Sequence, residues 1–225
     1  LTEKPKSFKG ICLDIGANVG NHSIFFSKKF DKVLAFEPLP MALKLLKINT
    51  EKYSNIKVYD FGLHSENKKI NFYLDRRNIG GTTSIIGNHS KLEICKLDVK
   101  KLDDLIMDKN KIKFIKMDVE GNELSVIMGA QKILSNFHPI IAFEQHLSDF
   151  NHNTTPSIEK LKEFGYNKFY ITKTAPEKLN KNSFFGKLIT LIYGLAFGGQ
   201  KTLIEVDNFF PDFYPIIIAE KNYDD

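Results

Sequence analysis

A glycine turn led by an acidic residue is the first part of the sequence whose residue types suggest ligand binding. Asp14, Gly16, Asn18 and Gly20 follow an apolar run and precede a helical pattern. Glycine at a strand-to-helix turn lets a ligand approach the backbone closely, and the start of a helix offers free N–H groups. A dinucleotide-binding fingerprint would need glycine at positions 14, 16 and 19, where the chain has Asp14, Gly16 and Val19. Because the acid stands where a pyrophosphate would lie, the turn favours a cationic or zwitterionic ligand.

A second acidic residue, Glu37, ends the next apolar run, 23 residues beyond Asp14. In a doubly wound sheet this position faces a ribose, and a carboxylate there can accept hydrogen bonds from the two ribose hydroxyls. A glycine turn alone is weak evidence, since tight turns also need glycine for structural reasons. The turn together with an acid at the end of the next strand is a considerably more specific signal.

Two more pairs of polar residues end neighbouring strands of the expected sheet: Asp118 with Glu120, and Glu144 with His146. Residues two apart in a strand share a face, so Glu144 and His146 can point together. A histidine or a carboxylate can take a proton from a reacting hydroxyl. The alternative for Glu120 is a helix N-terminal acid favoured by the helix dipole, and for His146 an exposed loop histidine. We expect no metal, and the alternative is a divalent metal held by these four residues with oxygen-rich ligation.

The elements that must position these residues alternate between strand-like and helix-like patterns, which is typical of an α/β domain with a mostly parallel sheet. Strands are predicted at residues 10–14, 32–37, 56–61, 112–118, 139–144, 168–173 and 215–221, and helices at residues 21–30, 40–49, 99–107, 120–134 and 155–164. Residues 69–99 are predicted to form a β-rich insertion after the third strand. The predicted fold is a doubly wound, Rossmann-like sheet of seven strands with one antiparallel strand near residues 215–220, in a single domain over residues 1–225. The carboxyl ends of the parallel strands form the edge where such sheets bind ligands.

Several of these segments together resemble one known family. The segments are Asp14-Ile-Gly-Ala-Asn-Val-Gly20, Phe36-Glu-Pro38, Leu102-Asp-Asp-Leu105, Ile115-Lys-Met-Asp-Val-Glu-Gly-Asn-Glu123 and Gly129-Ala130. Over roughly residues 10 to 145 the chain is similar to the FkbM family of S-adenosylmethionine-dependent methyltransferases, and the Asp-Val-Glu-Gly element is the most specific part. The resemblance implies a class I methyltransferase fold and O-methylation, often of a sugar or polyketide hydroxyl.

What the resemblance implies for the site agrees with the residue types. S-adenosylmethionine carries a sulfonium cation, an amino acid end, a ribose and an adenine. The amino acid end is expected at Asp14 and the backbone of residues 16–20, and the ribose at Glu37. The adenine is expected beside residues 61–63, where core packing is the alternative for Phe61 and Leu63. The expected cofactor-binding residues are Asp14, Gly16, Asn18, Gly20, Asn21, Glu37, Pro38, Phe61, Gly62, Leu63 and Asp118. The residues expected to act in catalysis, by taking the acceptor's proton, are His146, Asp118, Glu120 and Glu144.

Composition limits the class of protein. The chain has 225 residues, of which 42% are apolar and 26% charged, a balance ordinary for a globular protein. Its net charge of +5 comes from lysines scattered along the sequence, so we expect a solvated surface and no nucleic-acid partner. Cys12 and Cys95 lack CxxC spacing and suit a reduced compartment. The sequence shows no signal-peptide pattern and no apolar run near the ~18 residues that a membrane span needs, which predicts a cytoplasmic protein.

Residues 184–197 are the strongest apolar stretch and lie in a segment, 174–214, between the last two predicted strands. The stretch is too short and too interrupted by glycine to span a bilayer. Four roles are open: burial in the protein's own core, a lid that shapes acceptor binding, an oligomer contact and a peripheral membrane contact. Two functions besides methyl transfer to a carbohydrate or small-molecule hydroxyl stay open. One is a nicotinamide-dependent dehydrogenase on the same architecture, which Asp14 and Val19 disfavour, and the other is a non-catalytic protein that docks through residues 184–197.

Overall fold

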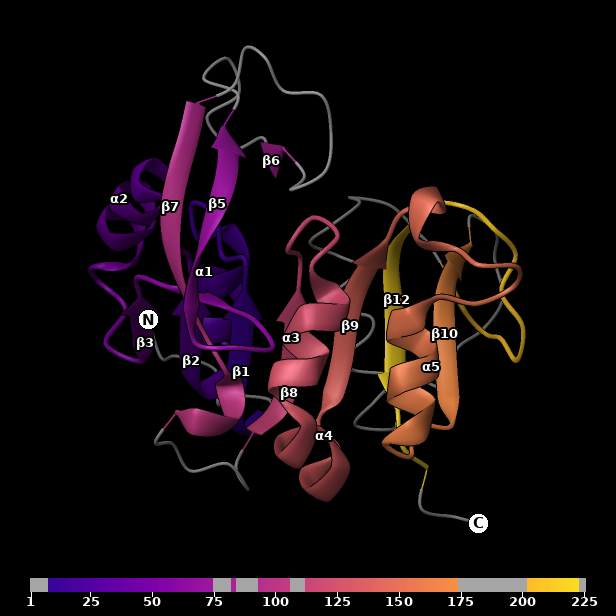
Figure 1. The fold of residues 1–225 in the computed structure, drawn as a ribbon. Coiled ribbons are helices and arrows are strands. Elements are labelled where there is room, and N and C mark those ends of the chain that lie inside the picture. Colours follow the sequence, from indigo (N-terminus) through magenta and orange to yellow (C-terminus); the bar gives the residue numbers. More distant parts are fainter. Residues whose placement is uncertain (1–7, 75–81, 84–92, 106–111, 174–201, 223–225) are drawn as a thin grey trace.

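A mixed sheet of eight strands runs through the part of the protein that the computed structural model describes, residues 8–74, 82–83, 93–105, 112–173 and 202–222 (Figure 1). Its strands are β1 (Phe8–Ile15), β2 (Phe30–Phe36), β3 (Ile56–Tyr59), β8 (Ile112–Met117), β9 (Ile140–Gln145), β10 (Lys168–Lys173), β11 (Thr202–Glu205) and β12 (Tyr214–Glu220). Their order across the sheet is β11-β10-β12-β9-β8-β1-β2-β3. The neighbours from β9 to β3 pair in parallel, whereas β12 lies antiparallel between β9 and β10.

The antiparallel strand expected near residues 215–220 is β12, but the predicted count of seven strands is wrong. β11 pairs antiparallel with β10 and adds an eighth strand at the edge of the sheet. It lies within the segment 174–214, for which the sequence pattern predicts no strand. The rest of that segment up to residue 201, with the apolar stretch 184–197, lies outside the described residues.

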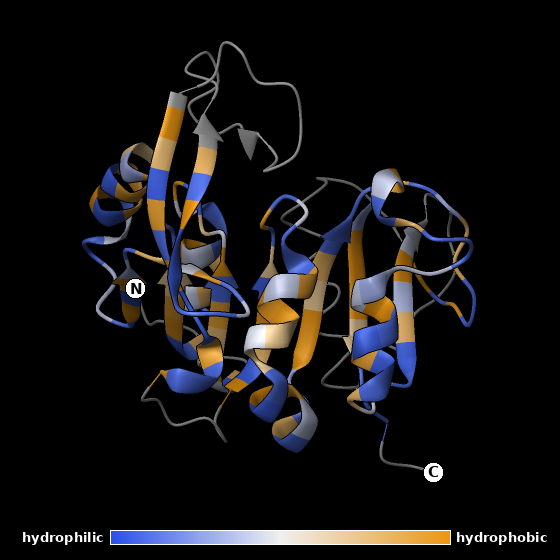
Figure 2. Ribbon diagram, viewed as in Figure 1, coloured by the Kyte–Doolittle hydropathy of each residue, from blue (hydrophilic) through white to orange (hydrophobic). Residues whose placement is uncertain are grey.

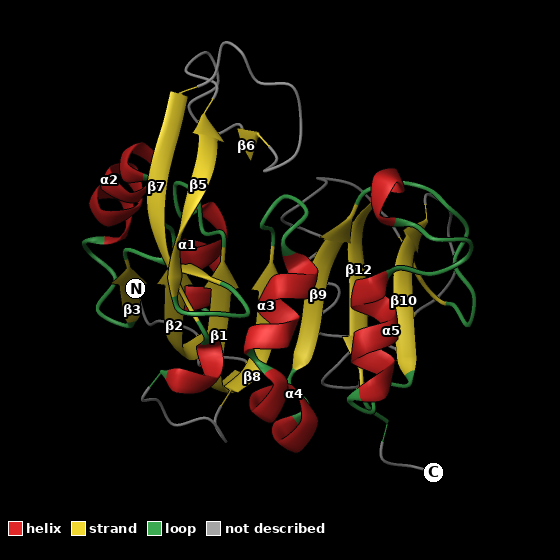
Figure 3. Cartoon of the chain, viewed as in Figure 1, coloured by secondary structure: helices red, strands yellow, loops and turns green. Residues whose placement is uncertain are grey.

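Helices cover both faces of the main sheet. They are α1 (Asn21–Ser27), α2 (Pro40–Thr50), α3 (Glu123–Gly129), α4 (Gln131–Phe137) and α5 (Pro156–Glu163). In β1, Leu13 and Ile15 pack in one apolar cluster with α3, α4 and α5, which lie in front of the strands in Figure 3. Cys12 points to the opposite face and packs with Phe26 of α1, while Leu46 of α2 covers the same side of β2. Burial on both faces is what parallel strands require, so the sheet is doubly wound as the sequence predicts.

The predicted β-rich insertion between β3 and β8 forms a second, smaller sheet. Its strands are β4 (Gly62–Leu63), β5 (Lys68–Leu74), β6 (Thr82–Thr83) and β7 (Glu93–Lys100), in the order β4-β7-β5-β6. β5 and β7 extend beyond the upper ends of β1 and β2 in Figure 1. Hydrophobic and hydrophilic residues alternate along both strands (Figure 2). Because alternate residues of a strand share a face, one face of this sheet is apolar.

The predicted helix at residues 99–107 is wrong. Val99 lies instead in β7, where it pairs with Lys68 of β5 and Gly62 of β4. Only Leu102–Asp104 forms a short 3-10 helix. Strand pairing therefore overrides the helical pattern at the start of this segment, and its last two residues lie outside the described ones.

The predicted helix at residues 120–134 is wrong in its bounds, because it starts later and is broken. Glu120 and Gly121 have φ of 52° and 85°, which is left-handed backbone, so helix α3 begins only at Glu123. A break at Ala130 then separates α3 from α4. The carboxylate of Asp103 accepts hydrogen bonds from the first turn of α4, from the backbone N–H groups of residues 132 and 133 at 2.8 and 3.1 Å. This contact from the 3-10 helix caps α4 and fixes the break.

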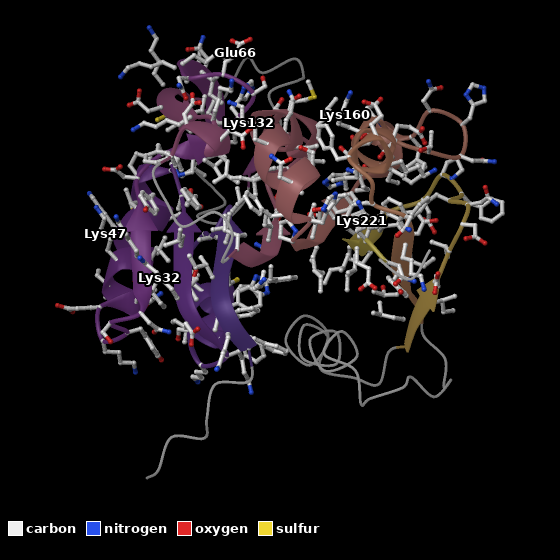
Figure 4. All side chains as sticks on the ribbon, turned by 90° about the horizontal axis from the view of Figure 1, so that it is seen from below. Lys32, Lys47, Glu66, Lys132, Lys160 and Lys221 are labelled. Atoms are coloured by element: carbon white, nitrogen blue, oxygen red, sulfur yellow. The ribbon has the colours of Figure 1, made fainter. Side chains whose placement is uncertain are left out.

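The labelled lysines of Figure 4 come from five separate places: β2, α2, α4, α5 and the residue after β12. Within the described part of the chain, no helix is both long and apolar enough to cross a membrane.

Candidate active site

A pocket opens at the carboxyl ends of β1, β2 and β8, beneath the second sheet. It holds about 860 Å³ of empty space counted out to its open mouth. The residues that line it are Ile15, Gly16, Asn18, Phe36, Glu37, Pro38, Leu39, Ala42, Gly62, Leu63, His64, Ile70, Phe72, Leu97, Val99, Asp118, Val119, Glu120 and Asn122. This is the edge of the sheet at which the sequence predicts a ligand.

The pocket has a polar side and an apolar side. Its polar side carries the glycine turn, Glu37 and Asp118. Its apolar side comes largely from the second sheet, through Ile70, Phe72, Leu97 and Val99. Such a pocket suits a ligand that has a flat apolar part joined to hydroxyls and charged groups.

The glycine turn adopts a backbone that few other residues could replace. Gly16 has φ of +74°, and a Cβ added there would lie 1.9 Å from the carbonyl oxygen of Asp118. Asn18 also has positive φ, at 50°. Gly20, at φ +93°, is buried against Leu46 of α2 and precedes α1, whereas Asn21 is exposed at the first position of that helix. Gly16 and Asn18 line the pocket, and Gly20 and Asn21 do not.

Glu37 is buried, with 4% of its surface exposed, and both carboxylate oxygens are held by backbone. Asn18 N–H donates to Oε2 and Leu39 N–H donates to Oε1, each at 2.8 Å. Burial raises the pKa of Glu37 above its ordinary value, although these two N–H groups lower it. Each carboxylate oxygen has a further lone pair, so Glu37 can accept bonds from a ligand without releasing the backbone.

Asp14, which we expect to bind the ligand's charged end, has no exposed surface and does not line the pocket. Ser23 donates its hydroxyl to Oδ2 of Asp14 at 2.5 Å, and the ammonium group of Lys116 lies 3.5 Å from Oδ1. Asp118, whose side chain is 40% exposed, lines the pocket. Of these two acids, Asp118 is the one that faces the pocket in this structure.

The turn after β3 divides the residues expected beside the adenine. Gly62 and Leu63 line the pocket, as does Pro38 after β2. Phe61 is buried in the main core, where its ring centre lies 5.4 Å from that of Tyr59, and it does not line the pocket. The structure therefore favours core packing for Phe61 alone.

The four residues expected in catalysis lie close together, but only Asp118 and Glu120 line the pocket. His146 Nε2 lies 3.9 Å from Glu120 Oε2, and both side chains are 38% exposed. Burial, reinforced by the negative charge of Asp118, raises the pKa of Glu144 to about 7, although nearby His146 lowers it. Among the described residues, no group of three histidine, cysteine or acidic side chains is placed to hold a metal ion. The arrangement offers proton acceptors at and beside the pocket.

Glu123 is a further buried acid, with 2% of its surface exposed, beneath the loop that carries Asp118 and Glu120. Its Oε1 accepts the N–H groups of Val119 at 3.3 Å and Gly121 at 3.4 Å. Burial raises the pKa of Glu123 to about 7, although the backbone N–H groups lower it. Glu120 sits between these two anchored residues in a left-handed conformation that is uncommon for glutamate, and such strain clusters at functional sites.

The family model of the methyltransferase FkbM domain matches residues 14–168. The chain belongs to the FkbM methyltransferase family. The matched residues of this FkbM domain include every residue that lines the pocket.

Two curated relatives and one solved structure show how far the similarity extends. The FkbM domain is 29% identical to the hexuronic acid methyltransferase AglP of Haloferax volcanii, over 57% of this chain and 53% of that protein. It is 25% identical to Methyltransferase 1 of Beauveria bassiana, over 52% of this chain and 57% of that protein. The chain thus spans about half the length of these relatives. A crystal structure of the methyltransferase FkbM of Methylobacillus flagellatus KT covers 61% of this chain and 33% of that chain, at 26% identity and a TM-score of 0.42.

Sequence reasoning did not single out two features at or beside this FkbM domain's pocket. One is Lys116, which lies beside the pocket, although a lysine inside a strand between the buried residues Ile115 and Met117 is itself a signal. The other is the apolar wall from β5 and β7, for which the alternating pattern predicts strands but not the surface that they cover. Both depend on contacts between segments far apart in the chain.

Proposed function

We propose that the protein is an S-adenosylmethionine-dependent O-methyltransferase that acts on a hydroxyl of a sugar, in a glycan or a nucleotide sugar. The observation that carries the proposal is Glu37. Its carboxylate is buried, and backbone N–H groups hold both oxygens. It follows the second strand and lies in the wall of a pocket that has a polar side and an apolar side. The relative named as a hexuronic acid methyltransferase supports a sugar as the acceptor.

The residues present fit each part of this donor. Glu37 would accept hydrogen bonds from the ribose hydroxyls, and Leu63 with the apolar wall of the second sheet would cover the adenine. Asp118 and the backbone of the glycine turn would hold the charged amino acid end. When bound, S-adenosylmethionine supplies an electrophilic methyl group on a sulfonium cation, which an acidic pocket edge stabilises by charge.

The chain's own chemical task is to receive the proton that the acceptor hydroxyl loses when its oxygen is methylated. His146 or one of its acidic neighbours Asp118, Glu120 and Glu144 is proposed as that base, because these side chains lie at or beside the pocket edge. A histidine, or a carboxyl group with a pKa near 7, is suited to proton transfer at neutral pH. Orientation and exclusion of water in the pocket would supply the rest of the rate.

Calorimetry tests the proposed class of donor directly. The protein is titrated with S-adenosylhomocysteine and, separately, with NAD. Binding of S-adenosylhomocysteine and not of NAD is the expected result. Binding of NAD alone would favour the dehydrogenase alternative, and binding of neither would favour a docking protein.

Mass spectrometry tests the proposed class of acceptor. Free hexuronic acids, hexoses and their nucleotide-linked forms are incubated with the protein and S-adenosylmethionine. The gain of one methyl group on a sugar, abolished by omission of the donor, is the expected result. If small-molecule alcohols in a parallel incubation gain the methyl group and none of the sugars does, the donor assignment stands and the sugar is overturned.

A further inference from the structure

Lys116 is a charged residue beside the pocket to which the proposed mechanism assigns no role. It comes from β8, and its side chain is 13% exposed. Three oxygens surround its ammonium nitrogen: the Gly16 carbonyl at 3.2 Å, Asp118 Oδ2 at 3.2 Å and Asp14 Oδ1 at 3.5 Å. An ammonium group has three N–H donors and no acceptor. Lys116 donates one hydrogen bond to the Gly16 carbonyl and forms ion pairs with Asp118 and Asp14, so its contacts in this structure are with the protein itself.

Two of the three oxygens belong to the pocket wall. Gly16 directly follows β1 and Asp118 directly follows β8, and both line the pocket. The two segments already touch, since Asp118 N–H donates to the Ile15 carbonyl at 3.1 Å. A Cβ on Gly16 would lie 1.9 Å from the Asp118 carbonyl oxygen, which leaves no room for either residue to shift toward the other. The ammonium group of Lys116 contacts both segments, at the Gly16 carbonyl and at Asp118 Oδ2.

Charge supports the same view of Lys116. Burial lowers the pKa of Lys116, but Asp14 and Asp118 more than offset this effect and hold the pKa above its ordinary value. The side chain is thus a cation between two carboxylates. One of them, Asp14, is fully buried, and the other, Asp118, is half-exposed to the pocket.

We propose that Lys116 is a positioning residue for the donor. It fixes the Gly16 carbonyl and the Asp118 carboxylate in the arrangement that receives the charged amino acid end of S-adenosylmethionine. The inference rests on the proposed donor, and it competes with a simpler role in which Lys116 only neutralises the buried Asp14. A buried carboxylate left without its cation destabilises a fold strongly, so removal of Lys116 alone cannot separate the two roles.

A pair of variants separates them. Asp14→Asn removes the buried charge and leaves the contacts from Lys116 to Gly16 and Asp118. Asp14→Asn with Lys116→Met removes those contacts too and leaves no orphaned charge at position 14. Calorimetry with S-adenosylhomocysteine should give an affinity about 10–100-fold weaker for the double variant than for Asp14→Asn, the effect of a displaced binding group. Affinities within twofold of each other would overturn the positioning role.

A second measurement covers the case in which Asp14→Asn weakens binding beyond detection. Amide hydrogen exchange of residues 14–20 is followed in both ligand-free variants. The proposal predicts at least tenfold faster exchange in the double variant within this turn, and equal exchange would overturn it. If the double variant does not fold, Lys116→Gln in the same Asp14→Asn background gives the same comparison. Wild-type protein that does not bind S-adenosylhomocysteine would overturn the proposed function itself, and the positioning role with it.

Discussion

The Glu37 end of the pocket differs from the region of Glu120 and His146 at and beside the pocket, the His146 end, in how its polar side chains are held. At the Glu37 end, the carboxylate is 4% exposed and accepts two backbone N–H groups at 2.8 Å. At the His146 end, His146 and Glu120 are each 38% exposed and lie 3.9 Å apart. Backbone hydrogen bonds fix the Glu37 carboxylate, whereas the more exposed His146 ring packs against Phe213, with the ring centres 5.4 Å apart. Variants at the Glu37 end should therefore change donor affinity, and variants at the His146 end should change turnover.

The largest effect is expected at the His146 end. His146→Ala should lower kcat by about 10²–10⁴, the usual contribution of a general base, and leave the affinity for S-adenosylhomocysteine unchanged. Steady-state kinetics with an acceptor that the protein methylates give kcat, and calorimetry with S-adenosylhomocysteine gives the affinity. His152→Ala, at an exposed histidine, is the control. Full kcat in folded His146→Ala would move the base to an acidic neighbour or leave positioning alone as the account.

The next largest effect is expected at Gly16, in the glycine turn after β1. Gly16→Ala should weaken binding of S-adenosylhomocysteine by about 100-fold or more, because the new Cβ would lie 1.9 Å from the Asp118 carbonyl oxygen. Gly121→Ala is a matched control, since Gly121 also has positive φ, +85°, but a Cβ there meets nothing within 4 Å. Calorimetry on both variants, with thermal melting to check folding, measures the difference. Equal losses would mean that backbone strain and not the clash decides the outcome.

A smaller effect is expected from removal of the Glu37 carboxylate. Glu37→Ala should weaken donor affinity by about 1–3 kcal/mol, the range for a lost hydrogen bond to a charged group. Glu51→Ala, at an exposed acid just after α2, should change it by less than about 0.5 kcal/mol. Titration calorimetry with S-adenosylhomocysteine gives both values. Unchanged affinity in folded Glu37→Ala would remove the ribose assignment.

The last effect concerns stability, and it comes from Glu123, beneath the loop that carries Asp118 and Glu120. The pKa of Glu123 is raised from 4.5 to about 7 by burial, so between these pH values the folded protein binds a proton that the unfolded chain has lost. The free energy of unfolding should therefore fall as pH rises through this window. Glu123→Gln should remove on the order of 1–3 kcal/mol of that fall, at 1.36 kcal/mol per unit of pKa.

Urea denaturation between pH 4.5 and pH 8 measures this effect. Glu66→Gln, at a side chain that is 67% exposed, is the control and should leave the pH dependence as it is. Glu144 and Glu220 also have pKa values of about 7, so part of the slope should persist in Glu123→Gln. An unchanged slope in Glu123→Gln would show that Glu123 does not contribute to the pH dependence.

Local patterns were enough to predict the central strands and the pocket residues that directly follow them. Gly16, Glu37 and Asp118 each come just after an apolar run, and each lines the pocket where the fold requires it. What the sequence could not show depends on contacts across long stretches of chain. Lys116 reaches the Gly16 carbonyl, 100 residues away, and Asp103 caps a helix start 30 residues later.

The same reason explains the misplaced elements. The 99–107 helix pattern is overridden because Val99 pairs with two other strands of the second sheet. Asp14 has the residue type expected for a ligand's cationic end, and in this structure the ammonium group of Lys116 lies 3.5 Å from its Oδ1. The residue type at a position thus predicts the charge of its partner, and only the folded structure shows which group lies beside it.

The position of β12 has a consequence for how the protein is made. β12 is the last strand of the described chain, yet it lies between β9 and β10, and it alone joins β10 and β11 to the rest of the main sheet. During synthesis, β9 must therefore wait with one edge unpaired until Tyr214–Glu220 has emerged from the ribosome. Exposed strand edges invite aggregation, and pairings that close late slow folding. A nascent chain that stalls before Tyr214 would keep its pocket residues but expose that edge to the cell's quality control.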